Sequence, residues 1–176
     1  FNAPLNTVAH KVGPALAAGN AVILKPSLHT PMSSCIMAEC LIEAGLPRGL
    51  ISVLHGDAEV AQWLLEQPAV NFDAFTGSTQ VFQSIWQKIG SRISTYRSYP
   101  RIVGETGGKD FVFAHPSAQA EALAVALVRG AFEYQGQKCS AASRAYIPKS
   151  LWPQVKERVV QEIKEMRIGD VADFRN

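Results

Sequence analysis

Short apolar runs alternate with longer stretches in which apolar residues recur every three or four positions over the first 90 residues. Apolar runs closed by turn residues indicate buried strands, and the longer periodicity indicates helices. The predicted strands are 21–24, 51–54 and 72–75, and the predicted helices are 31–44, 57–65 and 79–90. Strands that alternate with helices through short links favour a parallel sheet with right-handed crossovers. The predicted fold class is therefore α/β, with a doubly wound, Rossmann-like sheet.

The pattern changes after a polar segment at 91–100, which we predict to be a surface connection. Strands are predicted at 101–103, 111–113 and 145–147, and helices at 118–134 and 151–166. We place a domain boundary between residues 104 and 105. The chain starts without methionine and ends just past a helical pattern, so we expect it to be an internal part of a longer protein.

Composition narrows the class of protein. With 47% hydrophobic and 18% charged residues, the chain is neither a disordered tail nor a disulfide scaffold. The net charge of +2 gives no reason to expect a nucleic-acid partner, and no run of 18 uncharged apolar residues predicts a membrane span. The three cysteines form no CxxC pair and the four histidines form no spaced cluster, so no metal site is predicted.

Cys139 is the leading candidate for chemistry. Small residues follow it and Lys138 precedes it, which gives access to the sulfur and favours the nucleophilic thiolate. The alternative is a buried structural cysteine. Cys35 and Cys40 lie in an apolar helical stretch, and we predict that both belong to a helix core.

Glu105 is the candidate general base. It follows Gly104 at the end of an apolar strand and precedes a Gly-Gly pair, so its carboxylate is expected at the mouth of the sheet. The alternative is an ordinary solvated acid in a loop.

Two strand ends are candidates for binding phosphate or ribose. Lys25 closes the strand 21–24, where its ammonium can reach a ribose hydroxyl or a phosphate, although a surface lysine is an equal alternative. Gly77 and Ser78 open a helix, and the free N–H groups there suit a pyrophosphate, although a plain helix cap is the commoner case. Asn2 offers an amide donor near a helix start, where a capping role is the alternative.

Six segments together resemble the aldehyde dehydrogenase superfamily, and they occur in the order of that family over nearly the whole chain. The segments are FNAPLN at 1–6, GPALAAGN at 13–20, KPS at 25–27, FTGST at 75–79, ETGGK at 105–109 and GQKC at 136–139. The glutamate of ETGGK precedes the cysteine of GQKC by 34 residues, because 139 minus 105 is 34.

The resemblance implies a function for each matching residue. Cys139 is implied to attack the aldehyde carbon, Glu105 to activate the water that hydrolyses the resulting thioester, and Asn2 to hold the oxyanion together with the N–H of Cys139. The residues implied to bind the cofactor are Lys25, Ser27, Gly77 and Ser78.

The same resemblance assigns 1–104 to part of a cofactor-binding region and 105–176 to the start of a catalytic domain. The implied cofactor is NAD. Leu28 stands where relatives often carry the acid that holds the adenosine 2′-hydroxyl, so NADP stays open. The implied protein is an oxidoreductase of the cytoplasm or the mitochondrial matrix that acts on a small aldehyde and is homo-oligomeric at full length.

Within the superfamily, segments 97–111 and 132–141 resemble the Δ1-pyrroline-5-carboxylate (L-glutamate γ-semialdehyde) dehydrogenases. This implies oxidation of L-glutamate γ-semialdehyde to glutamate in proline catabolism, with Ser140 and Lys138 at the substrate carboxylate. Three alternatives remain: a general aldehyde dehydrogenase, an acylating enzyme that uses coenzyme A, and a non-catalytic homologue. The acylating class typically lacks the base found here as Glu105.

Overall fold

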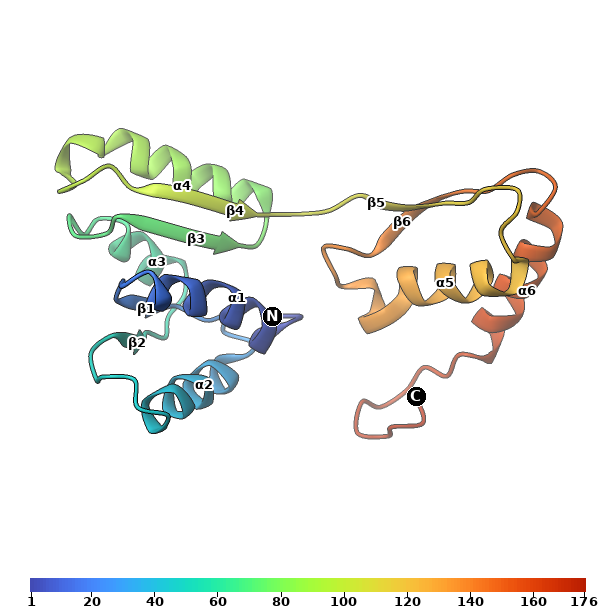
Figure 1. The fold of residues 1–176 in the computed structure, drawn as a ribbon, viewed down its shortest axis with the longest axis horizontal. Helices are drawn as coiled ribbons and strands as arrows, with labels where there is room; N and C mark the ends of the chain where they lie inside the picture. Colours follow the sequence, from blue (N-terminus) through green and yellow to red (C-terminus); the bar gives the residue numbers. More distant parts are fainter. The chain divides into compact units, whose positions relative to one another are not determined.

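The computed structural model describes residues 1–176 as two compact units, Phe1–Thr106 and Gly107–Asn176 (Figure 1). The first unit contains α1 (Pro4–Ala17), β1 (Val22–Leu24), α2 (Pro31–Glu43), β2 (Ile51–Val53), α3 (Ala58–Leu64), β3 (Phe72–Thr76), α4 (Thr79–Ser91), η1 (Ile93–Thr95) and β4 (Arg101–Glu105). The second contains β5 (Asp110–Phe113), α5 (Ala120–Phe132), η2 (Glu133–Gly136), β6 (Ala142–Tyr146) and α6 (Trp152–Glu165).

All strand pairs are parallel, which confirms the Rossmann-like α/β class. β1 pairs with β2, β3 with β4, and β5 with β6. The first unit thus holds two strand pairs where the sequence pattern predicts one sheet. The carbonyl oxygen of Ala74 in β3 accepts a hydrogen bond from Lys11 Nζ of α1, so this group of β3 is satisfied without a third strand.

Local signals at the helix starts explain where several helices begin. Asp57 accepts a hydrogen bond from the N–H of Glu59 at 3.0 Å and caps α3, as its position predicts. Thr30 occupies the N-cap position of α2, and its residue type favours a cap there, but its hydroxyl makes no capping bond. Pro31 at the first helical position needs no N–H partner, which removes part of the need for a cap.

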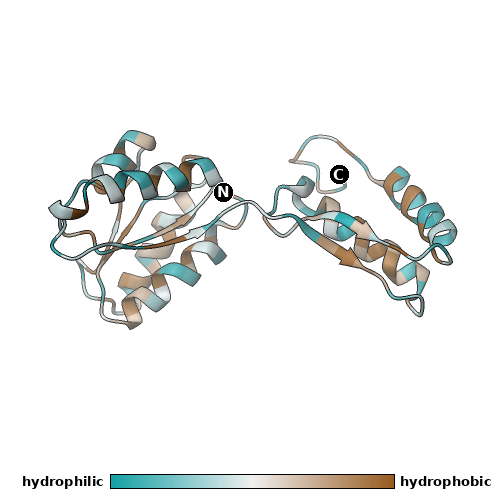
Figure 2. Ribbon diagram, turned by 90° about the horizontal axis from the view of Figure 1, so that it is seen from above, coloured by the Kyte–Doolittle hydropathy of each residue, from teal (hydrophilic) through white to brown (hydrophobic).

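Each unit packs its helices on its strands through apolar clusters of its own. In the first unit, one cluster joins α1, α2 and β2, and another joins the end of α3 to α4. In the second unit, Val155 of α6 is fully buried beside Leu123 of α5 and Ala114, which follows β5. Figure 2 shows hydrophobic residues along the strands of the second unit and both kinds of residue along its helices.

The segment 91–100 is mostly exposed, as predicted for a surface connection, but Tyr96 is an exception. Tyr96 is buried, and its hydroxyl donates a hydrogen bond to the carbonyl oxygen of Leu65. An apolar ring with one polar end suits such a position, because the ring packs in the core while the hydroxyl finds a backbone partner. Tyr96 therefore anchors the connection between α4 and β4 to the end of α3.

Candidate active site

The carboxyl ends of β3 and β4 bring the glycine–serine turn next to Glu105. Thr76 and Glu105 are register partners in the parallel pair, and the N–H of Gly77 donates to the carbonyl oxygen of Glu105 at 3.1 Å. The side chain of Glu105 is exposed at this strand end. Parallel pairing thus joins two motifs that lie nearly 30 residues apart, since 105 minus 77 is 28.

The glycine–serine turn leads directly into α4. Ser78 is the N-cap residue, and its Oγ accepts a hydrogen bond from the N–H of Val81 at 3.3 Å. A Cβ on Gly77 would lie 2.4 Å from Cζ of Phe75, so the turn is tightly packed on its strand side. The remaining N–H groups of the first helical turn are the kind of donors that bind anions.

Lys25 and Ser27 both lie just after β1 and already hold the loop between β1 and α2. Lys25 Nζ donates to the carbonyl oxygen of Gly56 at 2.8 Å, and Ser27 Oγ accepts from the N–H of His29 at 3.3 Å. Lys25, Ser27 and Thr76 are among the residues lining a cleft of about 920 Å³ in the first unit. An ammonium has three N–H donors, so Lys25 keeps a donor for a ligand in this cleft.

Lys11 is a further residue of this site, which the sequence motifs do not include. From α1, its ammonium donates to the carbonyl oxygen of Ala74 at 2.8 Å and to Oγ1 of Thr76 at 2.6 Å. These bonds tie α1 to the end of β3, where the glycine–serine turn begins. The sequence signal that could have pointed to Lys11 is its position next to Val12. Lys11 lies on the side of α1 that contains the buried residues Val8 and Val12.

Burial around Lys11 also changes two ionisation equilibria. Burial lowers the pKa of Lys11, and the carboxylates of Asp73 and Glu105 oppose this shift. Burial raises the pKa of Asp73, and the charge of Lys11 opposes that shift in turn. Oδ2 of Asp73 is buried without a hydrogen-bond partner, so the structure gives the Asp73 carboxylate little stabilisation beyond the charge of Lys11.

Asn2 lies at the beginning of the first unit, one residue before Ala3, which is the N-cap residue of α1. Asn2 and Glu105 both belong to the first unit, whereas Cys139 belongs to the second. Their convergence on one site stays a prediction.

Cys139 lies in a turn of the second unit that leads into β6. Its thiol is free and exposed, and the N–H of Ala141 donates to the carbonyl oxygen of Lys138 at 3.2 Å across the turn. A Cβ on Gly108 would lie 1.8 Å from the carbonyl oxygen of Cys139. Only glycine at 108 therefore lets the backbone before β5 approach the backbone of Cys139 this closely.

The segment before Cys139 winds left-handed. Helix α5 ends at Phe132, short of the predicted Tyr134, because Tyr134 and Gln135 take φ values of 52° and 53°. Gly136 follows with a φ of 69°. Positive φ is uncommon for residues other than glycine and costs roughly 1–2 kcal/mol per residue. Such backbone strain is found most often beside functional groups.

The two residues that flank Cys139 differ in their contacts. Lys138 Nζ forms an ion pair with Oε1 of Glu133 at 3.1 Å, whereas Ser140 is exposed. Both side chains are half-exposed in this pair, so its contribution to stability is small. The ammonium of Lys138 keeps N–H donors for a further anion.

The other two cysteines do not fill the helix core that the sequence analysis predicts. The buried residues of α2 are Ser34 and Ala38, one helical turn apart. Cys35 and Cys40 lie off this stripe, so Cys35 is only half-buried and Cys40 is exposed. No three His, Cys, Asp or Glu side chains gather as metal ligands, and none of the helices has the length and apolar content needed to cross a membrane.

The parallel strand pairs and the glycine–serine turn that opens α4 define a Rossmann-like α/β protein. The chain belongs to the aldehyde dehydrogenase family, which matches residues 1–175. This confirms the family resemblance of the six sequence segments.

Individual relatives point to one subgroup. The chain is 49% identical over 164 residues to a mitochondrial Δ1-pyrroline-5-carboxylate dehydrogenase of Dictyostelium discoideum, covering 92% of this chain and 29% of the relative. A crystal structure of the Mycobacterium tuberculosis enzyme bound with NAD is 47% identical, with a TM-score of 0.81 over 88% of this chain and 29% of that one. A Thermus enzyme with bound NAD is 33% identical, with a TM-score of 0.85 over 92% of this chain and 32% of that one. The chain thus spans about a third or less of the length of these relatives.

Proposed function

We propose that the whole protein containing this chain is an NAD-dependent oxidoreductase that converts L-glutamate γ-semialdehyde to L-glutamate in proline catabolism. The support is the aldehyde dehydrogenase family match together with relatives of up to 49% identity that are named Δ1-pyrroline-5-carboxylate dehydrogenase. In this proposal, residues 1–104 belong to the cofactor-binding region and residues 105–176 to the catalytic domain.

The contact between Gly108 and Cys139 is the observation that carries the proposal. It joins the ETGGK segment to the GQKC segment through their backbones. Glu105 precedes Gly108 by three residues, and three residues span at most about 11 Å even when fully extended. The covalent chain therefore limits the distance from Glu105 to Gly108, and the meeting of Glu105 with Cys139 at one site is part of the proposal.

The residues of the first unit fit NAD. Gly77 packs closely against the ring of Phe75, Ser78 opens α4, and Lys25 keeps a donor at the cleft. We assign the pyrophosphate to Gly77 and Ser78, and the adenosine ribose to Lys25 with Ser27. Leu28 offers no acid to the ribose 2′-hydroxyl, so NADP is the alternative cofactor that the assay must include. When bound, NAD supplies the hydride acceptor.

The first chemical step belongs to Cys139. Its thiolate adds to the aldehyde carbon and forms a thiohemiacetal, whose oxyanion accepts hydrogen bonds from the Asn2 amide and the N–H of Cys139. Loss of hydride from that carbon leaves a thioester on Cys139. Glu105 then takes a proton from the water that attacks the thioester, and the acid and the free thiol are released.

The substrate carboxylate is assigned to Ser140 and Lys138. The exposed hydroxyl of Ser140 is a donor next to the nucleophile, and Lys138 adds a positive charge on its other side. In this assignment the carboxylate shares Lys138 with Glu133. A substrate that lacks this carboxylate should lose binding more than turnover.

We further propose that the whole protein is a homo-oligomer and works in the mitochondrial matrix or the cytoplasm. The compartment rests on eukaryotic relatives whose names include "mitochondrial". The oligomeric state rests on the family resemblance alone, and native mass spectrometry of the whole protein tests it.

The test is pre-steady-state kinetics of the whole protein with γ-glutamyl semialdehyde and NAD. Cys139→Ala should abolish NADH formation, because no thiohemiacetal can form. Glu105→Gln should keep a burst of about one NADH per site and then stall, because acylation precedes the step that needs the base. Glu121→Gln makes the same chemical change on an exposed side chain of α5 and should behave like the wild type.

Two outcomes would overturn the proposal. Unchanged steady turnover of Glu105→Gln would remove Glu105 from deacylation. Turnover that requires coenzyme A, with a thioester as product, would assign the protein to the acylating class instead.

A further inference from the structure

A second cysteine of the chain has an imidazole partner. Sγ of Cys35, on α2, lies 3.2 Å from Nε2 of His55, which follows β2. The two residues are 20 positions apart in the sequence and come together because α2 packs beside β2 in the same apolar cluster. The thiol is half-buried and the imidazole is exposed, so the pair is open to small molecules.

We infer that Cys35 is a site of covalent modification by soft carbon electrophiles, with His55 as the base that activates its thiol. The thiolate is the reactive form of cysteine, and an imidazole at hydrogen-bond distance can take the thiol proton. The pair lies in the first unit, and neither Cys35 nor His55 is one of the proposed catalytic residues. The inference therefore does not rest on the proposed function.

The chemistry balances without a further reactant when the electrophile is an α,β-unsaturated aldehyde. The proton of Cys35 Sγ passes to Nε2 of His55, and the sulfur forms a bond to the β-carbon of the electrophile. The electron pair of the carbon–carbon double bond moves to the carbonyl group as an enolate. The imidazolium then returns the proton to the α-carbon, which leaves a thioether and a neutral imidazole.

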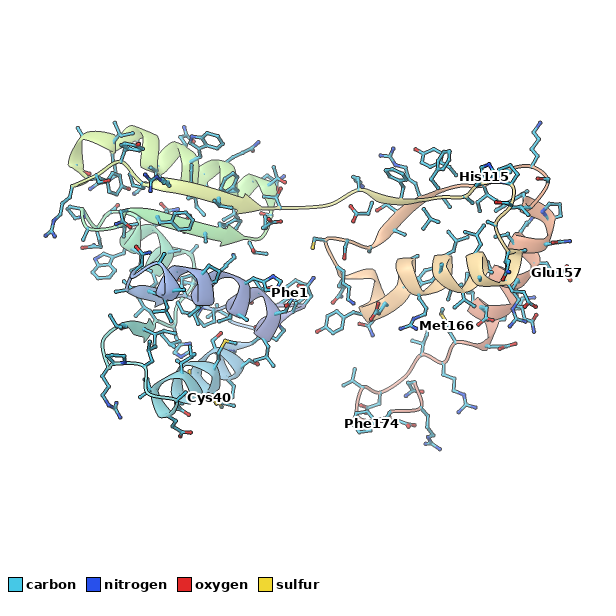
Figure 3. The ribbon with its side chains drawn as sticks, in the orientation of Figure 1. Phe1, Cys40, His115, Glu157, Met166 and Phe174 are labelled. Carbon is cyan, nitrogen blue, oxygen red and sulfur yellow. The ribbon has the colours of Figure 1, made fainter.

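Cys40 provides an internal control on the same helix. Figure 3 labels it on α2, and it is exposed, whereas Cys35 is half-buried. The structure gives Cys40 no imidazole partner. If exposure alone set the rate of modification, Cys40 would react first. If the imidazole sets it, Cys35 reacts first.

The experiment treats the natively folded whole protein with limiting acrolein and, separately, with iodoacetamide, and follows Cys35 and Cys40 by peptide mass spectrometry. Cleavage after Glu39 places Cys35 and Cys40 on different peptides. Cys35 should react about tenfold faster than Cys40, which is less than the rate enhancement that a well-positioned general base usually gives. The difference should vanish in concentrated guanidinium chloride, because the pairing exists only in the folded chain.

The matched variants are His55→Gln and His10→Gln. His55→Gln should lower the rate at Cys35 to that of Cys40, whereas His10→Gln, which changes an exposed histidine of α1, should leave it unchanged. The inference is wrong if Cys35 reacts no faster than Cys40 in the wild type, a comparison that needs no variant. It is equally wrong if His55→Gln leaves the rate at Cys35 unaltered.

Discussion

Two glycines of the family motifs, one in each unit, are closely packed for different reasons. A Cβ on Gly77 would lie 2.4 Å from Cζ of Phe75, which is the far end of a side chain. A Cβ on Gly108 would lie 1.8 Å from the carbonyl oxygen of Cys139, which is backbone. A ring can rotate away from an added methyl group, whereas a carbonyl oxygen moves only with its chain.

The difference shows how each unit supports its motif. Around Gly77, the strand end is held by side chains: Lys11 bonds to Thr76, and Ser78 caps α4. Around Cys139, it is the backbone itself that touches Gly108 and closes a turn from Lys138 to Ala141. We therefore expect the first unit to adapt to substitutions that the second does not tolerate.

Gly108→Ala should have the largest effect. The added methyl group must displace the Cys139 turn, and a nucleophile misplaced by about 1 Å costs on the order of 100-fold in rate. We expect kcat of the whole protein to fall by about that factor, with faster hydrogen exchange in 137–142. Gly107→Ala is the matched control, because nothing lies within 4 Å of a Cβ there. Equal activity of the two variants would contradict the backbone contact.

Gly77→Ala should have a smaller effect. The ring of Phe75 can shift, although it stacks on Phe82 with ring centroids 6.1 Å apart, so repacking should cost about 1–3 kcal/mol of unfolding free energy. We expect KM for NAD to rise while kcat changes less than tenfold. Steady-state kinetics and urea unfolding measure both. A fall in kcat as large as that of Gly108→Ala would end the distinction between the two units.

Tyr96→Phe tests whether one side-chain hydroxyl anchors the connection after α4. Removing it leaves the carbonyl oxygen of Leu65 without its side-chain partner, which should cost about 1 kcal/mol of unfolding free energy. Tyr99→Phe is the control, since Tyr99 is 66% exposed three residues further on. Urea titration of both variants should show the loss in the first only.

Asp73→Asn should have the smallest effect, and it depends on pH. Burial raises the pKa of Asp73, so the folded chain holds this proton more tightly than the unfolded chain. The stability contributed by the protonated carboxyl is therefore fully present below the unfolded pKa and is lost as pH rises through the folded pKa. Asparagine removes this dependence. The free energy of unfolding of the variant, measured with urea, should rise relative to that of the wild type as the pH rises from 4 towards 7. Parallel pH profiles of the two proteins would contradict the burial of the Asp73 charge.

Sequence periodicity predicts most elements well because strands and helices here follow their local pattern. The strand ends that carry Lys25, Gly77 and Glu105 are predictable too, since parallel strands place their carboxyl ends on one edge. The failures depend on tertiary contacts. Tyr96 is buried in a cluster with residues of α4 and the end of α3, and it bonds to the carbonyl oxygen of Leu65. Lys11 bonds to Ala74 and Thr76 of β3. None of these partners is visible in a window of local sequence.

The segment before Cys139 illustrates the same limit. The predicted, largely apolar helix runs on to Tyr134, and nothing in the identity of Tyr134 or Gln135 indicates a positive φ. The reversal depends on how the end of α5 meets the turn before β6. A local reading therefore extends the helix two residues too far.

The change of winding after Phe132 also separates the cysteine mechanically from the helix before it. The regular ladder of α5 stops there, so no continuous run of helical hydrogen bonds transmits a rotation of α5 to residue 139. A small rotation of α5 can therefore leave the sulfur in place, because the close approach of Gly108 and the turn from Lys138 to Ala141 position the thiol instead.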